Sequence, residues 1–535
     1  MIGAWACLSY ADTLCGVDGY LDGTKLLIKP TVVIIGAGLA GICAAIKLSE
    51  EGYKDILILE QAEDVGGTWR DNHYPGAACD TEALLYAFSF ASPRVWSKRH
   101  ASWEELQSYI QQLVDEHGLR DRIMLQQRLM SAEFDERTGF WMLETQQRLK
   151  VRCRYLVLAM GLLHKPHIPQ WLGLNRFKGH LFHSSAWDHR IDFASQRVVV
   201  VGTGASSVQF APWVAARARH LTVVQRTPNW VLPRFDQDYG FWQQHVLMTH
   251  APARHIYALG QMALDEIHTQ LHQTRSWRQT LQQLLRWRIR WQVKDSGTAR
   301  HLLPEDPLGC KPLLFSNDWY PMFNRSNVRL VTEGIRELTA DGLITWEGTF
   351  IPADTIILGT GFDSDPRLAW KDMRIIGIDH QDLLQTWRIS CSAYLGSMVH
   401  GFPNMFMLLG PNSVPAGRPF LRTVEAQLNW IIQCLRMSQQ QHADYFQIRQ
   451  EVQKRDEQQV QQALRTTVWQ SSGCTSWYQD VRGHNFVLWP WSFWRFWLRT
   501  READSHEFLF HRIKGRSGPG LARTERRLTR RLIPS

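Results

Sequence analysis

Two glycine-rich segments constrain this chain more than any other feature, because each has the pattern of a nucleotide-binding unit. TVVIIGAGLAGICAAIKLSEEGYKDILILE reads as a strand, a tight turn, a helix and a second strand, and RVVVVGTGASSVQFAPWVAARARHLTVVQRT repeats that order. In such units the turn lets the backbone approach a pyrophosphate at the N-terminus of the helix. We therefore expect an α/β fold with two Rossmann-like, dinucleotide-binding domains.

The two units end in side chains of opposite charge. Glu60 follows Gly36 by 24 positions, and Arg226 follows Gly202 by the same 24 positions. A carboxylate at the end of the second strand accepts hydrogen bonds from both free hydroxyls of a ribose, as in FAD. A guanidinium instead binds a 2′-phosphate through charge-assisted hydrogen bonds. We therefore expect FAD at the first unit and NADPH at the second.

Each turn has three positions at which the motif expects a glycine. In the first unit Gly36 permits the turn, Gly38 admits the pyrophosphate, and Gly41 allows close packing of helix and strand. The second unit holds the three corresponding places with Gly202, Gly204 and Ser207.

Two further apolar runs, 155–169 and 354–365, end in glycine turns and indicate where the chain passes between the units. The NADPH domain is therefore expected to be inserted in the FAD domain. Residues 236–300 have helical periodicity and few Gly or Pro, which predicts a helical excursion beside a substrate cleft. The expected order is an N-terminal extension (1–30), the first part of the FAD domain (31–166), the NADPH domain (167–350), the returning FAD domain with closing segments (351–500) and a basic flexible tail (501–535).

Composition excludes several other classes of protein. The chain has no run of eighteen uncharged apolar residues, so no transmembrane helix is predicted. Its nine cysteines form no C-x-x-C pair, so we expect neither a disulfide framework nor a metal site, and a cytoplasmic location. Six of the nine net positive charges lie from Lys514 onward, in the predicted tail. Nucleic-acid binding is therefore not indicated, and membrane association is not expected.

Several motifs resemble those of the Baeyer-Villiger monooxygenases, class B flavoproteins related to the flavin-containing and N-hydroxylating monooxygenases. FKGHLFHSSAWD at 177–188 matches their fingerprint F-x-G-x-x-x-H-x-x-x-W-[P/D], and GGTWRDNHYPGAACD at 66–80 matches G-G-x-W-x-x-x-x-Y-P-G-x-x-x-D. The likeness continues through QRTPNWVLPR at 225–234, SNDWYPMFNR at 316–325 and SSGCTSWY at 471–478. It covers residues from about 30 to about 500.

The resemblance implies site residues. Trp477 would lie on a mobile loop that closes over the nicotinamide, and His183 would be structural, coupling domain movement to NADPH. The FAD site would be lined by Thr68, Trp69, Asp80 and Tyr86. NADPH would be held by Gly202, Thr203, Gly204, Ser206, Ser207, Gln209, Arg226, Thr227 and Lys311.

The resemblance also implies the reaction. In this family NADPH reduces the flavin, O₂ adds to form a C4a-peroxyflavin, and the peroxide attacks a ketone to give an ester or lactone. The expected partners are O₂ and a small-molecule substrate, a bulky apolar ketone such as a terpenoid, steroid or polyketide of specialised metabolism.

One position departs from the family pattern. The family stabilises the peroxide with the arginine of a Lys-Arg pair, which the aspartate at the Asp80 position holds in place. Here the segment reads GCKPLLFSNDWYP, so Lys311 matches the lysine and Pro312 replaces the arginine. Loss of one preorganised charge of this kind costs about 10²–10³ in rate.

Three interpretations of this departure stay open. Arg418, in GPNSVPAGRPF, supplies another guanidinium, so that Asp80 and Arg418 are the catalytic candidates. Alternatively, a hydroperoxyflavin hydroxylates the substrate or oxygenates its nitrogen or sulfur. The third interpretation is a non-catalytic relative that only binds nucleotides.

Overall fold

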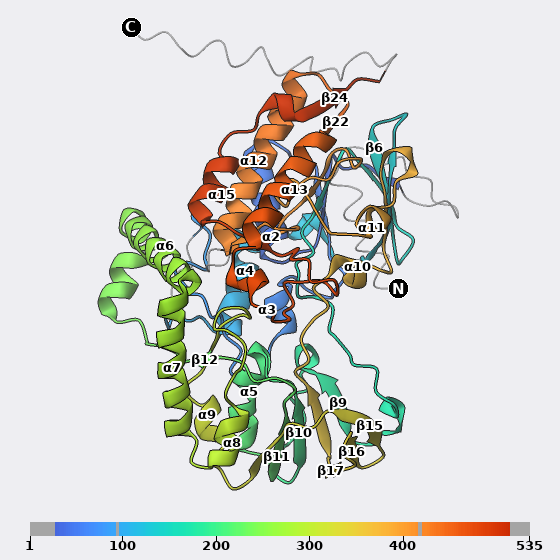
Figure 1. Ribbon diagram of the computed structural model, residues 1–535. Coiled ribbons are helices and arrows are strands. Elements are labelled where there is room, and N and C mark those ends of the chain that lie inside the picture. The colour runs from blue at the N-terminus through green and yellow to red at the C-terminus, as the bar shows by residue number, and fades with distance from the viewer. Residues whose placement is uncertain (1–26, 92–95, 416–419, 514–535) are drawn as a thin grey trace.

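The computed structural model describes residues 27–91, 96–415 and 420–513, and in these residues two five-stranded parallel sheets form the centre of the molecule (Figure 1). Nearly all side chains of both sheets' central strands are buried, as expected for parallel sheets covered on both faces. The first sheet has the order β20 (Met405–Met407), β8 (Tyr155–Leu158), β2 (Val32–Ile35), β3 (Ile56–Leu59) and β4 (Ile123–Met124). The second has the order β14 (Val328–Val331), β11 (His220–Val224), β10 (Arg197–Val201), β18 (Thr355–Leu358) and β9 (His180–His183).

Each glycine-rich turn leads from a central strand into a helix, as the sequence predicts. Helix α2 (Leu39–Glu50) follows β2 and begins after Gly38, and α5 (Ala205–Ala215) follows β10 and begins after Gly204. The strands of the two units pair in the same way, with Val32 opposite Ile56 and Val198 opposite Leu221. The carboxyl ends of β3 and β11 therefore lie beside the glycine turns, where Glu60 and Arg226 follow.

Smaller sheets and further helices enclose these two units. The mixed sheet β1-β7-β6-β5-β19 comprises Leu27–Ile28, Lys150–Cys153, Phe140–Thr145, Leu129–Asp135 and Arg374–Ile376. The hairpin sheet β15-β16-β17 comprises Ile335–Thr339, Gly342–Thr345 and Phe350–Pro352. Three two-stranded sheets pair β12 (Val231–Leu232) with β13 (Leu314–Phe315), β21 (Val414–Pro415) with β23 (Leu488–Trp489), and β22 (Tyr445–Ile448) with β24 (Phe508–His511).

The remaining α-helices are α3 (Thr68–Asp71), α4 (Trp103–Glu116), α6 (Ala251–Gln273), α7 (Arg275–Gln292), α8 (Ser296–His301), α9 (Trp319–Met322), α10 (Pro366–Ala369), α11 (Leu383–Thr386), α12 (Phe420–Gln440), α13 (Gln450–Leu464), α14 (Val468–Ser471) and α15 (Phe493–Thr500). Short helical turns occur at η1 (Arg120–Arg122), η2 (Leu174–Arg176), η3 (Ser184–Ala186), η4 (Gln243–Leu247), η5 (Ile378–His380) and η6 (Ser505–Glu507). Figure 1 shows α12, α13 and α15 around the first sheet in the upper part, and α6 and α7 along one side.

The chain passes from the first sheet to the second between β8 and β9, and it returns after β18. The two connecting segments lie side by side, because Pro166 and Phe362 form an isolated β-bridge and the His167 amide donates to the Gly361 carbonyl at 2.9 Å. The expected return at residue 351 is wrong, because β18 lies between β10 and β9 in the second sheet. The return therefore begins after Leu358.

Two other expectations concern the insertion and the chain ends. The segment 236–300 does contain helices, namely α6, α7 and most of α8. The expected tail from 501 is wrong for its first residues, because β24 pairs with β22 and Phe508 is buried. Residues 514–535 of that tail and residues 1–26 of the expected N-terminal extension lie outside the described residues.

Candidate functional site

A cavity of about 660 Å³ opens at the glycine turn of the first unit. That volume is typical of a site for a small molecule or a cofactor. Of the residues expected to bind FAD, Gly41 does not line this cavity. Those that do are Gly36, Gly38, Glu60, Thr68, Trp69, Asp80 and Tyr86, and Trp477 lines it as well.

The turn itself requires glycine. Gly36 has φ +103°, and a Cβ there would lie 2.6 Å from the Ala159 carbonyl oxygen. Gly41 is buried under the turn, where a Cβ would lie 1.9 Å from the Gly36 oxygen, so its role is packing. Gly38 faces Gly67, and a Cβ on Gly67 would lie 3.2 Å from the Gly38 Cα. Side chains at these positions would fill the space in which a pyrophosphate approaches the α2 N-terminus.

Glu60 is buried at the carboxyl end of β3, with only 4% of its surface exposed. Its Oε2 accepts a hydrogen bond from the Ala37 amide at 2.7 Å, and its Oε1 accepts from the Arg70 Nη1 at 3.2 Å. These contacts fix the carboxylate beside the glycine turn, at the wall of the cavity. Oε1 also accepts from the Ala62 amide at 3.0 Å. Each carboxylate oxygen has two lone pairs, so acceptor capacity for a ribose hydroxyl remains on Oε2.

Aromatic side chains form another part of the wall. The Trp69 indole donates to the Tyr86 hydroxyl at 3.2 Å, and the two rings meet edge to face at 5.7 Å. Trp477 reaches the cavity from the segment 472–485, whose backbone is held by a hydrogen bond from the Ser364 hydroxyl to the Trp477 carbonyl at 2.9 Å. The cavity is therefore apolar on one side and polar at the glycine turn.

The second unit presents an exposed cationic face beside its turn. Gly204 opens onto free space, because a Cβ there would have no other atom within 4 Å, whereas Gly202 has φ +104° and lies against Gly359. Arg226 and Thr227 are exposed after β11, and within the described part of the chain the Arg226 guanidinium has no carboxylate partner. Such a guanidinium is free to bind a phosphate group.

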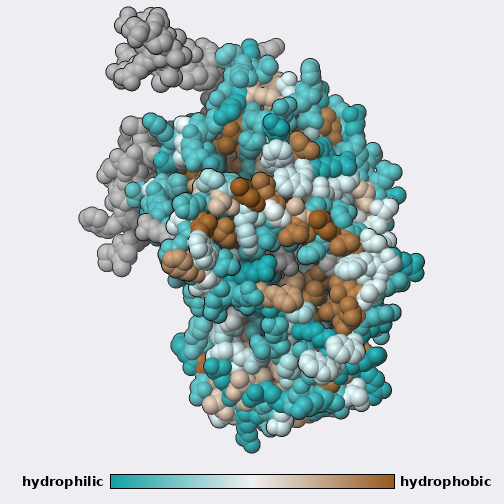
Figure 2. Space-filling model, turned by 90° about the vertical axis from the view of Figure 1, so that its left-hand side faces the viewer, coloured by the Kyte–Doolittle hydropathy of each residue, from teal (hydrophilic) through white to brown (hydrophobic). Residues whose placement is uncertain are grey.

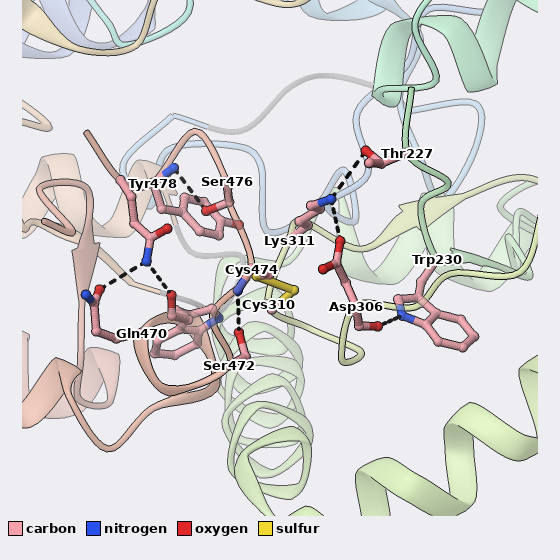
Figure 3. Close-up of a disulfide and its surroundings, with 12 residues drawn as sticks. Thr227, Trp230, Asp306, Cys310, Lys311, Gln470, Ser472, Cys474, Ser476 and Tyr478 are labelled. Atoms are coloured by element: carbon pink, nitrogen blue, oxygen red, sulfur yellow. Dashed lines mark hydrogen bonds and ion pairs between the residues drawn. A yellow bond between two sulfur atoms is a disulfide. The ribbon is translucent and has the colours of Figure 1, made fainter. Parts of the chain in front are cut away.

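Lys311 lies next to this face. Its ammonium is 3.5 Å from the Thr227 hydroxyl and 2.5 Å from the Asp306 carboxylate (Figure 3). Thr203 is adjacent to Thr227, because its hydroxyl donates a hydrogen bond to the Thr227 carbonyl at 3.2 Å. Arg226, Thr227, Lys311 and Thr203 are thus brought together at one end of β11.

The other residues expected at the NADPH site have different positions. Ser207 is fully buried, and its hydroxyl occupies the place where a Cβ of Gly359 would lie. Its side chain therefore packs helix against strand, as Gly41 does, and its contact with NADPH stays a prediction. Gln209 joins the two units, because its amide donates to the Ala78 carbonyl at 3.0 Å and accepts from the Tyr74 hydroxyl at 3.0 Å. Ser206 lies near the same tyrosine.

Asp80 has a cation beside it that the sequence pattern did not indicate. Its Oδ1 lies 4.0 Å from the Arg234 Nη1, and the Arg234 side chain is only 13% exposed. Arg234 also donates to the Cys79 carbonyl at 3.3 Å. Its backbone is held by Asn317, which accepts from the Arg234 amide at 3.0 Å and donates to its carbonyl at 2.8 Å. The guanidinium is therefore held in place next to a residue that lines the cavity.

Pro312 therefore does not leave Asp80 without a cationic neighbour. The partner comes from the QRTPNWVLPR segment, 154 positions further along the chain. The other candidate for this charge, Arg418, lies outside the described residues.

A disulfide joins Cys310 to Cys474 (Figure 3), contrary to the expectation from cysteine spacing that the chain has no disulfide framework. The two cysteines are 164 positions apart and both are buried, so no local spacing motif could reveal the pair. The bond connects the residue before Lys311 to the segment that carries Trp477. Asp306 lies within 4.8 Å of both sulfurs, but it pairs with Lys311 and the sulfurs bond each other.

This bond gives the first prediction. Cys474→Ser is expected to lower the free energy of unfolding by about 2 kcal/mol, because the cross-link closes a long loop and restricts the unfolded chain. Urea unfolding with and without dithiothreitol measures the effect. Reductant should destabilise the parent protein and leave Cys474→Ser unchanged, and equal sensitivity of both proteins would contradict the prediction.

His183 links the two segments that connect the sheets. Its Nε2 donates to the Gly361 carbonyl at 2.9 Å, and its Nδ1 accepts from the Ser185 amide at 3.2 Å, an arrangement of the neutral ring. Burial lowers the pKa of His183 below its ordinary value. The residue therefore lies at the crossing between the two units, and its coupling of domain movement to NADPH stays a prediction.

The lowered pKa predicts a pH effect on stability. A histidine held neutral in the fold stabilises the protein above about pH 6.5, and this contribution is lost as the pH falls below 6.5 through the folded pKa. Four carboxyl groups with raised pKa values, those of Asp55, Asp71, Asp456 and Glu507, oppose the trend. We therefore expect the melting temperature to fall more between pH 7.5 and 5.5 in the parent than in His183→Gln. Parallel falls in the two proteins would contradict this role.

The chain is similar in sequence to known monooxygenases. Residues 33–274 match the family described as pyridine nucleotide-disulphide oxidoreductase. A Baeyer-Villiger monooxygenase of Pseudomonas aeruginosa is 34% identical over 89% of this chain and 90% of its own length. The phenazine N-monooxygenase of Lysobacter antibioticus is 34% identical over 75% of this chain and 81% of its own length.

Solved structures agree with these relatives. The complex of OTEMO with FAD and NADP superposes with a TM-score of 0.82 at 27% identity, covering 90% of this chain and 99% of that one. Sequence identity of 34% across nine tenths of both chains, together with this shared fold, leads to one assignment. The chain belongs to the Baeyer-Villiger monooxygenase family.

Proposed function

We propose that this protein is an FAD-dependent monooxygenase that uses NADPH and O₂ to convert a bulky apolar ketone into an ester or lactone. The proposal rests on one observation above all. Two strand-turn-helix units of matching register carry a buried carboxylate in one case and an exposed guanidinium in the other. This pairing supports two different nucleotides in one chain, a ribose diol at Glu60 and a 2′-phosphate at Arg226.

The first unit fits FAD. The glycine turn gives room for a pyrophosphate, Glu60 accepts from the ribose, and Trp69 and Tyr86 exclude water from the opposite wall. Bound FAD would supply the redox chemistry that accepts a hydride and activates O₂. The second unit fits the phosphate end of NADPH through Arg226, Thr227 and Lys311. Asp306 holds the Lys311 ammonium in that region.

Asp80 lines the cavity, and Arg234 lies 4.0 Å from Asp80 without lining the cavity itself. Arg234 has the properties of a preorganised cation, since it is mostly buried and its backbone is fixed on both sides by Asn317. We propose that this guanidinium orients Asp80 and stabilises negative charge that develops near it, in place of the arginine that Pro312 replaces. Negative charge in a site of this kind is stabilised best by donors that need no reorganisation.

A single experiment tests the function. The purified protein is analysed for bound FAD and is then incubated with NADPH, ¹⁸O₂ and a panel of cyclic, steroidal and aromatic ketones. We expect one equivalent of FAD, faster oxidation of NADPH than of NADH, and esters that carry one ¹⁸O atom. NADPH consumption that yields only hydrogen peroxide with every ketone would contradict the proposal, and so would a protein that binds no flavin.

Oxygenation of a nitrogen or sulfur atom is the second candidate. It is favoured by Pro312, which removes the family's cation, and by the likeness to the phenazine N-monooxygenase. Aromatic amines and sulfides are therefore added to the same panel. N-oxides or sulfoxides formed without any ester would identify this chemistry.

Two further proposals accompany the function. We propose that FAD occupies the part of the chain that forms the first sheet and NADPH the inserted part that forms the second, up to Leu358. We also propose a cytoplasmic location, which is supported by five buried free thiols among the described cysteines and opposed by the Cys310–Cys474 disulfide.

A further inference from the structure

Helix α7 has two apolar faces, and only one of them is covered. Leu285 and Ile289 are buried against the second unit. On another face, Trp277, Leu284, Trp287 and Trp291 are 47%, 59%, 65% and 71% exposed. Their spacings of seven, three and four residues place all four side chains on the same side of the helix. Water-exposed tryptophans in such a row require an explanation that packing among the described residues does not give.

The charged side chains of α7 are all positive. Between Arg275 and Gln292 the helix contains five arginines and no Asp or Glu. Arg288 is turned inward, where it donates to the Val231 carbonyl at 2.9 Å. Arg275, Arg290 and the following Lys294 are exposed. Arg290 and Lys294 therefore border one edge of the exposed apolar row.

The neighbouring helix α6 extends this surface. It contacts α7, and its exposed apolar side chains are Ile256, Leu259, Leu264 and Ile267. Figure 1 shows both helices along one side of the molecule, away from the two sheets. Figure 2 views that side and shows brown, apolar side chains gathered across its middle among teal ones.

We propose that the outer faces of α6 and α7 bind the surface of a membrane that contains anionic lipids. Tryptophan and leucine side chains enter the boundary between headgroups and acyl chains, and flanking arginines and lysines attract the anionic headgroups. In the part of the chain that the structure describes, no helix is long and apolar enough to cross a bilayer. Binding at the surface needs no such helix. A bulky apolar ketone partitions into membranes, so this surface would bring the enzyme to its substrate.

The charges favour a membrane over a second copy of the chain. In a twofold dimer the same patch meets itself, which would place the exposed cations of one α7 near those of the other. Helix α7 offers no carboxylate to neutralise them, and the two acidic residues of α6, Asp265 and Glu266, are half-buried. An anionic lipid surface is complementary to both the tryptophan row and its cationic border.

Vesicle flotation of the full-length protein tests the proposal. Vesicles of phosphatidylcholine with 30% phosphatidylglycerol are compared with pure phosphatidylcholine in 100 mM NaCl. We expect the parent to bind the anionic vesicles at least 10-fold more tightly. The triple variant Leu284→Ser, Trp287→Ser, Trp291→Ser should bind at least 10-fold more weakly than the parent. Trp346→Ser, which removes an equally exposed tryptophan from another surface, is the matched control and should bind like the parent.

Three outcomes would overturn the proposal. One is equal binding of the triple variant and the parent, with both retaining FAD. Another is loss of binding in a chain that ends at Ile513, which would assign the effect to the basic residues after it. The third is a parent dimer that the triple substitution converts to monomers, measured by light scattering, which would make this face a subunit interface. The ketone assay on soluble substrate separates this proposal from the proposed function, because the triple variant should keep that activity.

Discussion

Arg234→Met is expected to reduce ester formation by about 10²- to 10³-fold at saturating ketone, with the FAD content unchanged. Arg234 is mostly buried, and its guanidinium lies 4.0 Å from the Asp80 carboxylate and 3.8 Å from that of Asp236. Its removal takes away the preorganised cation that we propose beside Asp80, and such a loss costs about 3 to 4 kcal/mol in the transition state. Steady-state kinetics with product analysis measures the effect, which should fall on kcat much more than on KM for the ketone.

Two further variants separate this role from a structural one. Arg234→Lys keeps the charge and should recover at least tenfold over the methionine variant. Pro312→Arg restores the residue typical of the family and should change the parent's rate by less than about threefold, because Arg234 already supplies a cation. A gain of tenfold or more from Pro312→Arg would show instead that the parent lacks this charge. Loss of FAD in both Arg234 variants would indicate a structural role.

The sequence predicts the two nucleotide units because their physics is local. A parallel strand buried on both faces needs a continuous apolar run, and the turn that follows needs glycine where a Cβ would strike the next strand. Gly36 against Ala159 and Gly202 against Gly359 are both contacts of this kind. The equal spacing to Glu60 and Arg226 then follows from the lengths of helix and strand.

The features that the sequence did not predict depend on how distant segments meet. Arg234 and Asp80 approach across the junction of the two units, and Cys310 and Cys474 approach across 164 positions. Neither pair has a spacing rule. Ser207 illustrates a different cause, since its position matched the glycine motif but its side chain turned into the helix-strand contact. Helical periodicity likewise shows which residues of α7 share a face, but not which face the fold covers.

The coenzyme preference gives the second large expected effect. Arg226→Gln is expected to lower kcat/KM for NADPH by about 10²-fold and to change that for NADH by less than threefold. The guanidinium is exposed at the end of β11, beside Thr227 and Lys311, and within the described residues it has no competing carboxylate. A forked, charge-assisted contact with the 2′-phosphate is lost in the variant, whereas NADH never makes that contact.

A matched substitution makes this result specific. Arg329→Gln removes an exposed arginine from the edge strand β14 of the same sheet, so it changes the net charge equally without touching the end of β11. Arg329→Gln should leave kcat/KM for both coenzymes unchanged. If Arg226→Gln lowers kcat/KM for NADPH and NADH alike, the side chain supports the fold of the loop and does not bind the 2′-phosphate. If Arg329→Gln lowers kcat/KM for NADPH as much as Arg226→Gln does, the preference arises from the overall electrostatic field of the domain. The proposal assigns FAD and NADPH to the two matching turns by their opposite charges. Only a loss of kcat/KM that is confined to NADPH and to the Arg226 variant supports it.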